Sequence, residues 1–249
     1  VRDYSRLKSV FEKCKPDLVF HLAAQALVKK SYENPSDTFS INFLGSLNIL
    51  ELSRASKSLK SLIYVTSDKC YENKEWEWGY RENDQLGGAD PYSASKASAE
   101  ILYSSYQRSF FKKKSYLRSA SARAGNVIGG GDWSSNRLIP DIVRSWIKSK
   151  PVIIRSPGSV RPWQHVMEPI FGYLKLIEQI WENPSDFSGG WNFGPDPDNF
   201  KNVFNIVDLA NQLWNDNSNF KIMEDKYFKE SKILILDNKK RKNLLNINP

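Results

Sequence analysis

Tyr92 and Lys96 are separated by three residues, so on a helix the phenol and the ammonium group lie on one face. An ammonium group beside a phenol favours the phenolate and lowers a pKa that is ordinarily about 10. The tyrosine can then accept a proton near neutral pH. The same spacing occurs at Tyr4 and Lys8, and in a chain with 11 tyrosines such a pair can equally be a solvated helix face.

Two short apolar runs, 17–22 and 62–65, have the length of buried strands, and each leads into residues that could form a site. The second run is followed by side chains that can exchange or hold protons, namely Ser67, Asp68 and Lys69. The first run ends beside Ala23 and Ala24, whose small side chains let a flat ligand approach the backbone. Both ends favour a site where the strands leave the sheet.

Helix-like and strand-like patterns alternate along the first half of the chain. Helices are expected at 4–13, 36–56 and 91–111, and strands at 17–22, 62–65 and 116–123. Ser36 is the expected cap of the second helix. The expected apolar stripe of that helix is Phe39, Phe43, Leu47 and Leu50. Two successive β-α-β units imply an α/β fold, a doubly wound parallel sheet of the Rossmann type.

After residue 125 the elements become shorter, and glycine, proline and tryptophan become more frequent. This change favours a smaller lobe that binds substrate and is interleaved with the end of the sheet. We therefore expect a Rossmann-type domain over residues 1–125 and a mainly substrate-binding lobe over residues 126–249.

The composition is that of an ordinary globular protein, with 40% hydrophobic and 26% charged residues. No window approaches 18 consecutive apolar residues, so no membrane span is expected. Cys14 and Cys70 are the two cysteines, and His21 and His165 the two histidines. Their spacing is not that of a zinc site, and no bound metal is expected. So few cysteines favour a reducing, cytoplasmic setting.

A net charge of +8 raises the question of nucleic-acid binding. The basic residues are scattered, except for the runs 112–114 and 239–242. Neither run has aromatic residues between its charges or a known nucleic-acid-binding motif. We therefore expect no nucleic-acid partner, and a diphosphate substrate could use part of the positive field.

Longer motifs resemble those of the extended short-chain dehydrogenases/reductases. They are His-Leu-Ala-Ala at 21–24, an asparagine at Asn42, Thr-Ser-Asp at 66–68 and Tyr-x3-Lys at 92–96. Within that family the segment 66–73 looks like the CDP-glucose 4,6-dehydratases, whereas the related dTDP-glucose enzymes carry Glu at the position of Lys69. The stretches 123–133 and 161–166 match as well, so the resemblance covers nearly the whole chain.

The resemblance implies dehydration of CDP-glucose to CDP-4-keto-6-deoxyglucose, with transient hydride transfer to bound NAD. It implies that Tyr92 takes the proton of the sugar 4-hydroxyl, and that Lys96 lowers the Tyr92 pKa and contacts the nicotinamide ribose. Ser67 would stabilise the charge that develops on the 4-oxygen. Asp68 would protonate the departing 6-hydroxyl, and Lys69 would remove the C5 proton. These roles need a protonated Asp68 and a partly neutral Lys69.

The resemblance also implies binding residues. Those expected at the cofactor, besides Tyr92 and Lys96, are Asp3, Leu22, Ala23, Ala24, Gln25, Asn42 and Thr66. Those expected at the substrate diphosphate are Asn126, Arg137 and Arg161, because guanidinium groups bind phosphate in a bidentate manner. Trp133 and Trp163 could pack near the base or sugar, although tryptophan is more often part of a core. Asn42 could simply bond to backbone, and His21 and His165 are expected to be structural.

The family's Gly-x-x-Gly-x-x-Gly turn, which binds the NAD pyrophosphate, does not occur among the 13 glycines, and 129–131 differs from it in place and pattern. We therefore expect a fragment that begins after the family's first two β-α segments. Alone, it should bind NAD weakly or not at all and be poorly soluble. The alternative is a divergent chain that has lost cofactor binding.

Three functions remain open: a dehydratase, a nucleotide-sugar epimerase or decarboxylase of the same fold, and a non-catalytic relative. Epimerases usually have small polar residues at the positions of Asp68 and Lys69, so this pair favours elimination of water. The resemblance further implies a homodimer formed through 36–56 and 91–111, and a role in making deoxysugars for lipopolysaccharide.

Overall fold

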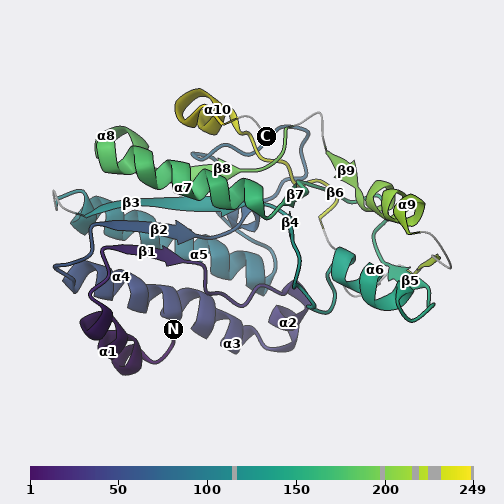
Figure 1. Cartoon of the computed structure of the whole chain (residues 1–249), viewed down its shortest axis with the longest axis horizontal. Coiled ribbons are helices and arrows are strands. Elements are labelled where there is room, and N and C mark those ends of the chain that lie inside the picture. Colours follow the sequence, from purple (N-terminus) through teal and green to yellow (C-terminus); the bar gives the residue numbers. More distant parts are fainter. Residues whose placement is uncertain (114–116, 197–199, 215–218, 224–230, 248–249) are drawn as a thin grey trace.

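The computed structural model describes residues 1–113, 117–196, 200–214, 219–223 and 231–247. In this part of the chain the central sheet has four parallel strands in the order β1-β2-β3-β8 (Figure 1). Their bounds are Leu18–His21 for β1, Ser61–Val65 for β2, Arg118–Ala124 for β3 and Gly189–Phe193 for β8. Because every pair is parallel, the carboxyl ends of the strands meet at one edge of the sheet.

Helices cover both faces of this sheet, as the side chains of β2 show. Leu62 and Tyr64 belong to the core beneath α1, α4 and α5, whereas Ile63 belongs to the core beneath α7. Successive side chains of a strand point to opposite faces, so one buried strand serves two cores. The covering helices are α1 (Tyr4–Cys14), α4 (Gly45–Ala55), α5 (Pro91–Tyr106) and α7 (Met167–Glu182). The expected Rossmann-like α/β fold is confirmed.

The helix expected over 36–56 starts one residue earlier than predicted and is not α-helical throughout. It begins as α3 (Pro35–Phe39), and its cap is Asn34 rather than Ser36. The Asn34 side chain accepts a hydrogen bond from the backbone N–H of Asp37 at 3.1 Å. The helix then passes through a π-helical stretch, Ser40–Leu44, before it continues as α4.

The inward face of this helix is also different from the expected apolar stripe. Among the four residues of that stripe only Leu50 is fully buried. Small polar side chains are buried instead, namely Thr38, Asn42, Ser46 and Ser53. Three of these bond to β1 or to the loop that follows it, through His21 and Gln25. The inward face therefore combines hydrogen bonds to the loop after β1 with apolar packing of Ile49 and Leu50.

The remaining elements of the first half lie close to their expected positions. A short helix, α2 (Val28–Glu33), follows β1, and α5 continues into a π-helical turn, Gln107–Phe111. The strand expected over 116–123 is β3, and residue 116 lies outside the described residues.

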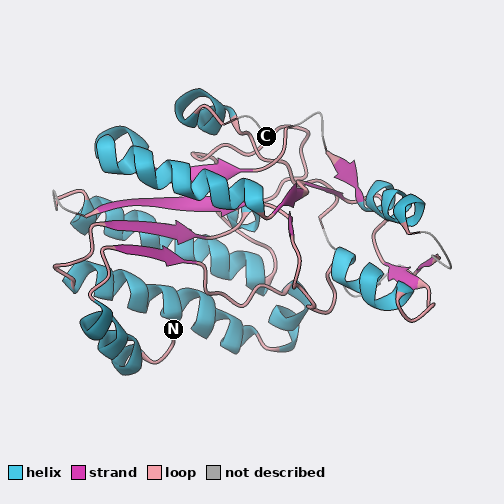
Figure 2. Cartoon of the chain, in the orientation of Figure 1, coloured by secondary structure: helices cyan, strands magenta, loops and turns pink. Residues whose placement is uncertain are grey.

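Beyond β3 the chain leaves the sheet, builds a lobe and returns (Figure 2). The lobe contains α6 (Leu138–Trp146) and α9 (Val203–Leu213), which pack together through Ile142, Trp146 and Val207. Its paired strands are β4 (Val127–Ile128) with β7 (Gln164–His165), β5 (Val152–Ile154) with β10 (Phe220–Ile222), and β6 (Val160–Arg161) with β9 (Lys201–Asn202). The elements that return to the sheet are α7, α8 (Pro184–Phe187), β8 and α10 (Lys239–Leu245).

The basic run 239–242 forms part of α10 and is largely used inside the protein. The Lys240 ammonium donates to the Gly190 carbonyl at 2.7 Å and lies 4.0 Å from the centre of the Trp191 ring. Arg241 is 1% exposed, and Lys242 forms an ion pair with Asp196. The run is therefore an anchor for α10 rather than an exposed basic patch.

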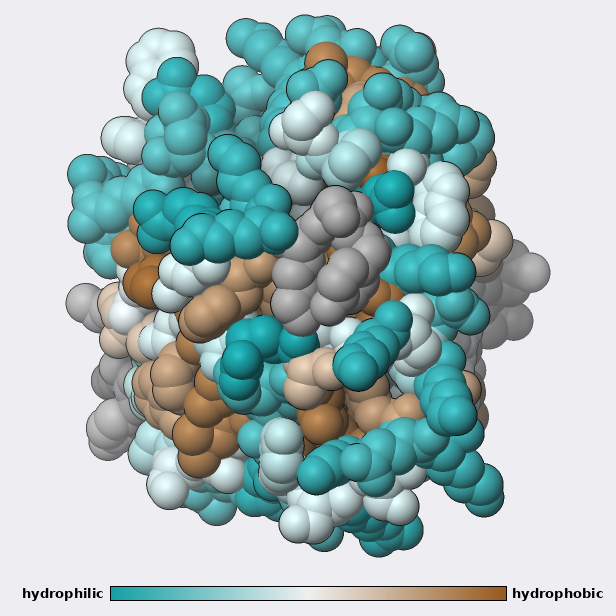
Figure 3. All heavy atoms as spheres, turned by 90° about the vertical axis from the view of Figure 1, so that its left-hand side faces the viewer, coloured by the Kyte–Doolittle hydropathy of each residue, from teal (hydrophilic) through white to brown (hydrophobic). Residues whose placement is uncertain are grey.

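The end of the molecule that holds the amino ends of the strands faces the viewer in Figure 3. Hydrophilic side chains cover much of this face, with apolar areas between them. One exposed apolar side chain at the amino end of the sheet is Leu18, the first residue of β1. Within the described residues no helix combines the length and the apolar character needed to cross a bilayer.

Candidate active site

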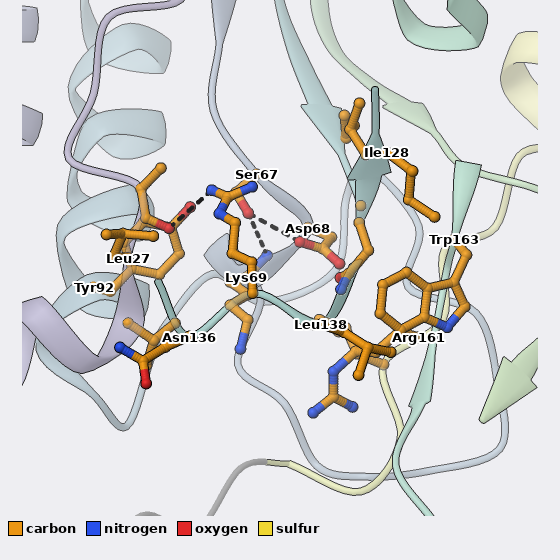
Figure 4. A pocket seen from close by; sticks show the side chains of 18 of the residues that line it. Leu27, Ser67, Asp68, Lys69, Tyr92, Ile128, Asn136, Leu138, Arg161 and Trp163 are labelled. Atoms are coloured by element: carbon orange, nitrogen blue, oxygen red, sulfur yellow. Dashed lines mark hydrogen bonds between the residues drawn. The ribbon is translucent and has the colours of Figure 1, made fainter. Parts of the chain in front are cut away.

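The carboxyl ends of the strands open into a cavity of about 1080 Å³ that lies between the sheet and the lobe (Figure 4). It is lined by the residues that follow β1, β2 and β3, by the start of α5, and by α6 and β7 of the lobe. All five expected catalytic side chains line this one cavity: Ser67, Asp68, Lys69, Tyr92 and Lys96. The fold thus brings together groups that are up to 29 positions apart in the chain.

The first three of these residues form a turn at the end of β2. Ser67 caps a 3-10 helix, Asp68–Cys70, by accepting the backbone N–H of Lys69 at 3.3 Å. The Ser67 hydroxyl donates to Asp68 Oδ1 at 2.9 Å, as the dashed lines in Figure 4 show. Asp68 is 3% exposed, and its second oxygen, Oδ2, has no hydrogen-bond partner among the described residues. Burial raises the pKa of this carboxyl group, more than the positive charge of Lys69 lowers it.

Tyr92 lies in the first turn of α5, where Pro91 and the capping side chain of Asp90 start the helix. The backbone N–H of Tyr92 donates to Ser31 Oγ at 3.1 Å, which ties α5 to α2. Sequence reasoning missed this contact, because nothing in the sequence pairs positions 31 and 92.

The electrostatics of the tyrosine–lysine pair differ from the expectation. Burial raises the pKa of Tyr92 to about 12, and the nearby Ser67 side chain opposes this increase only in part. The Lys96 ammonium lies 6.0 Å from the centre of the Tyr92 ring, and burial lowers the pKa of Lys96 to about 8. In the free site both groups are therefore driven toward their neutral forms. An additional positive charge is needed to favour the phenolate near neutral pH.

The second pair with the same spacing, Tyr4 and Lys8, has no such surroundings. It lies on α1, where Tyr4 is 41% exposed and Lys8 faces Glu12 across 3.8 Å. Tyr4 and Lys8 therefore form a solvated helix face, which is the non-catalytic interpretation of this spacing.

The expected cofactor residues divide into those that face the cavity and those that support its wall. Leu22, Ala24 and Thr66 line the cavity, whereas Ala23 and Gln25 do not. Asn42 is 2% exposed and bonds to the backbone N–H and C=O of Gln25 and to Ser95 Oγ, at 2.8–3.0 Å. It therefore clamps the loop after β1 to α5 and does not reach the cavity.

Asp3 lies outside the cavity as well. Its carboxylate caps α1 by accepting the backbone N–H of Arg6 at 2.9 Å. The residue is exposed, and the structure gives it a capping role at this position.

The expected substrate residues all line the cavity on the lobe side. Asn126 follows β3, Arg137 precedes α6, and Arg161 is the last residue of β6. Arg137 lies 3.5 Å from Asp132, and Arg161 is 3% exposed. Among the aromatic candidates, Trp133 and Trp163 also line this side. The positive charges of Arg137 and Arg161 act on Tyr92 and Asp68 respectively, so the cations that could bind a diphosphate adjoin the proton-transfer groups.

A buried ion pair beneath the site was not predicted. The Glu100 carboxylate, one turn beyond Lys96, accepts hydrogen bonds from Thr66 Oγ1, from Ser121 Oγ at 2.9 Å and from Arg123 at 2.7 Å. Glu100 and Arg123 are 1% and 5% exposed. The pair therefore fixes the end of β2 against α5 and β3. The available signal was an acidic residue four positions after Lys96 on a helix of mostly small and apolar residues.

Arg123 extends this network to the far side of the site. Its guanidinium donates to the Tyr71 hydroxyl at 2.8 Å and to the Glu82 carbonyl at 2.9 Å. Tyr71 in turn donates to Asn192 Oδ1 at 2.7 Å on β8. The network therefore links Tyr71, which follows the catalytic turn, to β3 through Arg123 and to β8 through Asn192.

His21 is a hydrogen-bonded core residue, as expected, with Nε2 3.0 Å from Ser46 Oγ. Burial and the positive charge of Lys96 lower its pKa from 6.5 to about 4. Because the unfolded chain binds more protons between these values, the contribution of His21 to stability is present above pH 6.5 and lost as the pH falls toward 4. The shift corresponds to about 3 kcal/mol of unfolding free energy.

We predict that the unfolding free energy of the wild type, measured by urea denaturation, falls more steeply over this pH range than that of His21→Gln. His165→Gln, at an exposed position, is the matched control and should keep the slope of the wild type. Equal slopes for the wild type and His21→Gln would contradict the assignment.

Comparison with known proteins agrees with this fold. A family described as the NAD dependent epimerase/dehydratase family matches residues 1–188. The chain belongs to this family. It is 46% identical over 241 residues to the CDP-glucose 4,6-dehydratase of Salmonella typhimurium, an alignment that covers 95% of this chain and 67% of that protein. It is also 25% identical to the UDP-glucose 4-epimerase of Mycoplasma pneumoniae, over 99% of this chain and 75% of that protein.

Solved structures show the same fold. One is the UDP-glucuronic acid 4-epimerase of Bacillus cereus, in complex with UDP-glucuronic acid and NAD. It superimposes with a TM-score of 0.84 at 19% identity, and the match covers 98% of this chain and 73% of the epimerase chain. The dTDP-glucose 4,6-dehydratase of Streptomyces venezuelae, with NAD bound, has a TM-score of 0.82 and 20% identity, and covers 100% of this chain and 72% of its own.

The cofactor of the family is NAD, and the residues around β1 and β2 fit its nicotinamide end. Ala24 and Ala26 present small side chains to the cavity, so a flat ring can approach the backbone there. Tyr92 and Lys96 offer a hydroxyl and an amine suited to the hydroxyls of a ribose. The chain contains no Gly-x-x-Gly-x-x-Gly turn for the pyrophosphate.

Proposed function

We propose that this protein is an NAD-dependent hydro-lyase that converts CDP-glucose to CDP-4-keto-6-deoxyglucose and water. The observation that supports this most directly is the Ser67–Asp68–Lys69 turn beside Tyr92 in one cavity, because elimination of water needs an acid and a base besides the tyrosine. The 46% identity to the Salmonella CDP-glucose 4,6-dehydratase supports the choice of nucleotide.

The roles of the side chains follow from their positions. Tyr92 accepts the proton of the 4-hydroxyl, and Ser67 stabilises the 4-oxygen. When bound, NAD supplies the reversible oxidation at C4 and, through its cationic ring, the positive charge that favours the Tyr92 phenolate. Asp68 protonates the leaving 6-hydroxyl, a role that its raised pKa suits because the acid form persists to higher pH. Lys69, half-buried at the cavity wall, exchanges the C5 proton.

The substrate end of the cavity is proposed to bind the nucleotide. Asn126, Arg137 and Arg161 hold the diphosphate, and Trp133 and Trp163 contact the base or sugar. Leu22, Ala24, Thr66 and Lys96 contact NAD directly. Ala23, Gln25 and Asn42 act on the cofactor site through the backbone that they position.

A homodimer, formed through the surfaces of α4 and α5, is also proposed. Leu44, Ile101 and Phe110 are exposed apolar side chains on or beside these helices, at 49%, 58% and 41%. Burial of such residues in a second copy would stabilise a dimer. By resemblance, the setting is cytoplasmic and the product serves deoxysugar synthesis for lipopolysaccharide, with no nucleic-acid or membrane partner.

The test measures the 4-keto sugar after incubation with CDP-glucose and saturating NAD, with dTDP-glucose as the control substrate. It is run on the chain itself and on a fusion that supplies a glycine-rich NAD-binding segment ahead of Val1, with NAD binding measured separately. Product from CDP-glucose alone supports both the reaction and the nucleotide. Bound NAD without keto sugar from either substrate overturns the proposal, and epimerised sugar would identify the alternative reaction.

A further inference from the structure

Within the described residues three arginines line the cavity: Arg137, Arg155 and Arg161. The charges of Arg137 and Arg161 act on the proton-transfer groups, so these two lie near the reacting sugar. Arg155 directly follows β5, and Figure 1 shows β5 at the end of the molecule away from the central sheet. Because a diphosphate separates the sugar from the base in a nucleotide sugar, Arg155 lies where the base is expected.

The surroundings of Arg155 are those of a slot for a flat ring. Ile153 is the middle residue of β5, and both of its neighbours on the strand point into the lobe core. Its own side chain therefore turns the other way and is exposed at the cavity. Leu138 and Val203 pack against the same core and line the cavity as well. Apolar walls beside a guanidinium group suit a nucleobase, which has apolar faces and a polar edge.

Asn136 holds the guanidinium group of Arg155 at the cavity. Arg155 Nη1 donates to Asn136 Oδ1 at 3.2 Å. Asn136 has a φ of 63°, in the left-handed region that asparagine adopts more readily than most residues, and it lines the cavity (Figure 4). Among the described residues no carboxylate forms an ion pair with Arg155, whereas Arg137 lies 3.5 Å from Asp132. The other N–H groups of Arg155 and the second lone pair of Asn136 Oδ1 are therefore open to a ligand.

We propose that Arg155 and Asn136 recognise the cytosine ring and select CDP-sugars over UDP-sugars and dTDP-sugars. The Watson–Crick edge of cytosine presents two neighbouring acceptors, O2 and N3, and then the donor N4–H. The guanidinium group presents two neighbouring donors, and Asn136 Oδ1 presents an acceptor beside them, so the two edges match. Uracil and thymine carry N3–H and O4 instead, which sets donor against donor and acceptor against acceptor. The inference rests on the proposed function and names the residues that choose its nucleotide.

The test measures the dissociation constants of CDP and UDP, which differ only in the base, by calorimetry on the chain itself without NAD. The wild type is expected to bind CDP more tightly than UDP. Arg155→Lys keeps the positive charge but loses the planar pair of donors, so it should lower this preference by at least about tenfold. Asn136→Gly tolerates the positive φ and removes the acceptor, so the preference should fall as well. Asn136→Asp keeps an acceptor oxygen and should retain it.

Arg137→Lys is the matched comparison, because a residue that binds the diphosphate should affect both nucleotides by the same factor. Equal losses for CDP and UDP in Arg155→Lys would mean that Arg155 binds phosphate, and would overturn the proposal. A wild type that binds CDP no more tightly than UDP would overturn it too. Formation of the keto sugar is measured separately. If CDP is preferred through Arg155 but no keto sugar forms, the dehydratase reaction fails while this assignment stands.

Discussion

Replacing Tyr92 by Phe is expected to lower the turnover number for dehydration by about 10²–10⁴-fold, because the substitution removes only the oxygen that accepts the 4-hydroxyl proton. The ring stays in its buried position, so the fold and the binding of substrate and NAD should change little. Turnover is measured through the 4-keto sugar, and NAD binding by a direct titration. The loss should appear in the turnover number rather than in KM.

The chain provides a matched control for this substitution. Tyr4→Phe removes a hydroxyl from a pair with identical spacing, on a helix face exposed to solvent. It should leave turnover within about twofold of the wild type, because solvent-exposed substitutions away from a site have small effects. Equal effects of the two substitutions would remove Tyr92 from the chemistry. Retained turnover in Tyr92→Phe would move the proton-accepting role to another side chain of the cavity.

Replacing Arg123 by Met is expected to lower the unfolding free energy by about 3–5 kcal/mol, because it leaves the carboxylate of Glu100 buried without its cation. The remaining donors to Glu100 are the hydroxyls of Thr66 and Ser121, which cannot compensate a full charge. The substitution also removes the donor to the Tyr71 hydroxyl. Urea denaturation at neutral pH measures the loss.

Two further variants distinguish the buried charge from a general loss of packing. Arg81→Met breaks an ion pair with Asp84 in which the arginine side chain is 64% exposed, and should cost about 0–1 kcal/mol. Adding Glu100→Gln to Arg123→Met removes the unpaired charge and should recover part of the stability. A loss below 1 kcal/mol in Arg123→Met, or no recovery in the double variant, would contradict an ion pair that supports the end of β2.

The buried pair also explains why the catalytic turn can be small. Thr66, which bonds to Glu100, follows β2 and directly precedes Ser67, so the ion pair fixes the residue between the strand and the 3-10 turn. The turn is held by the hydrogen bonds of Ser67 at its start and by Cys70, which is buried in an apolar cluster, at its end. The bonds of Glu100 on α5 to Ser121 and Arg123 on β3 therefore hold the base of the turn, and with it the proton-transfer groups, in place.

The sequence by itself determined the order of the elements and the edge of the sheet where the site forms. Short apolar runs indicate β1 and β2, because strands buried on both faces are mostly apolar, whereas β3 buries the polar side chains of Ser119, Ser121 and Arg123. Their parallel arrangement then brings the residues after 22 and after 65 to one edge. The Tyr-x3-Lys spacing and the Ser67–Asp68–Lys69 run could be found in the sequence, because local spacing on a helix or turn is a property of the chain alone.

Only the tertiary structure decided which of those residues face the cavity and what charge they carry. Asn42 and Thr38 turn inward because Gln25, which is distant in the sequence, donates hydrogen bonds to both side chains, although an apolar stripe was available. Burial, which spacing cannot reveal, moves the Tyr92 pKa upward where the local lysine suggested the opposite. The Glu100–Arg123 pair and the approach of Tyr92 to the Ser67–Asp68 turn exist only once α5, β2 and β3 are packed together. Long-range contacts set desolvation and hydrogen bonding, and these two quantities decide the chemistry of the site.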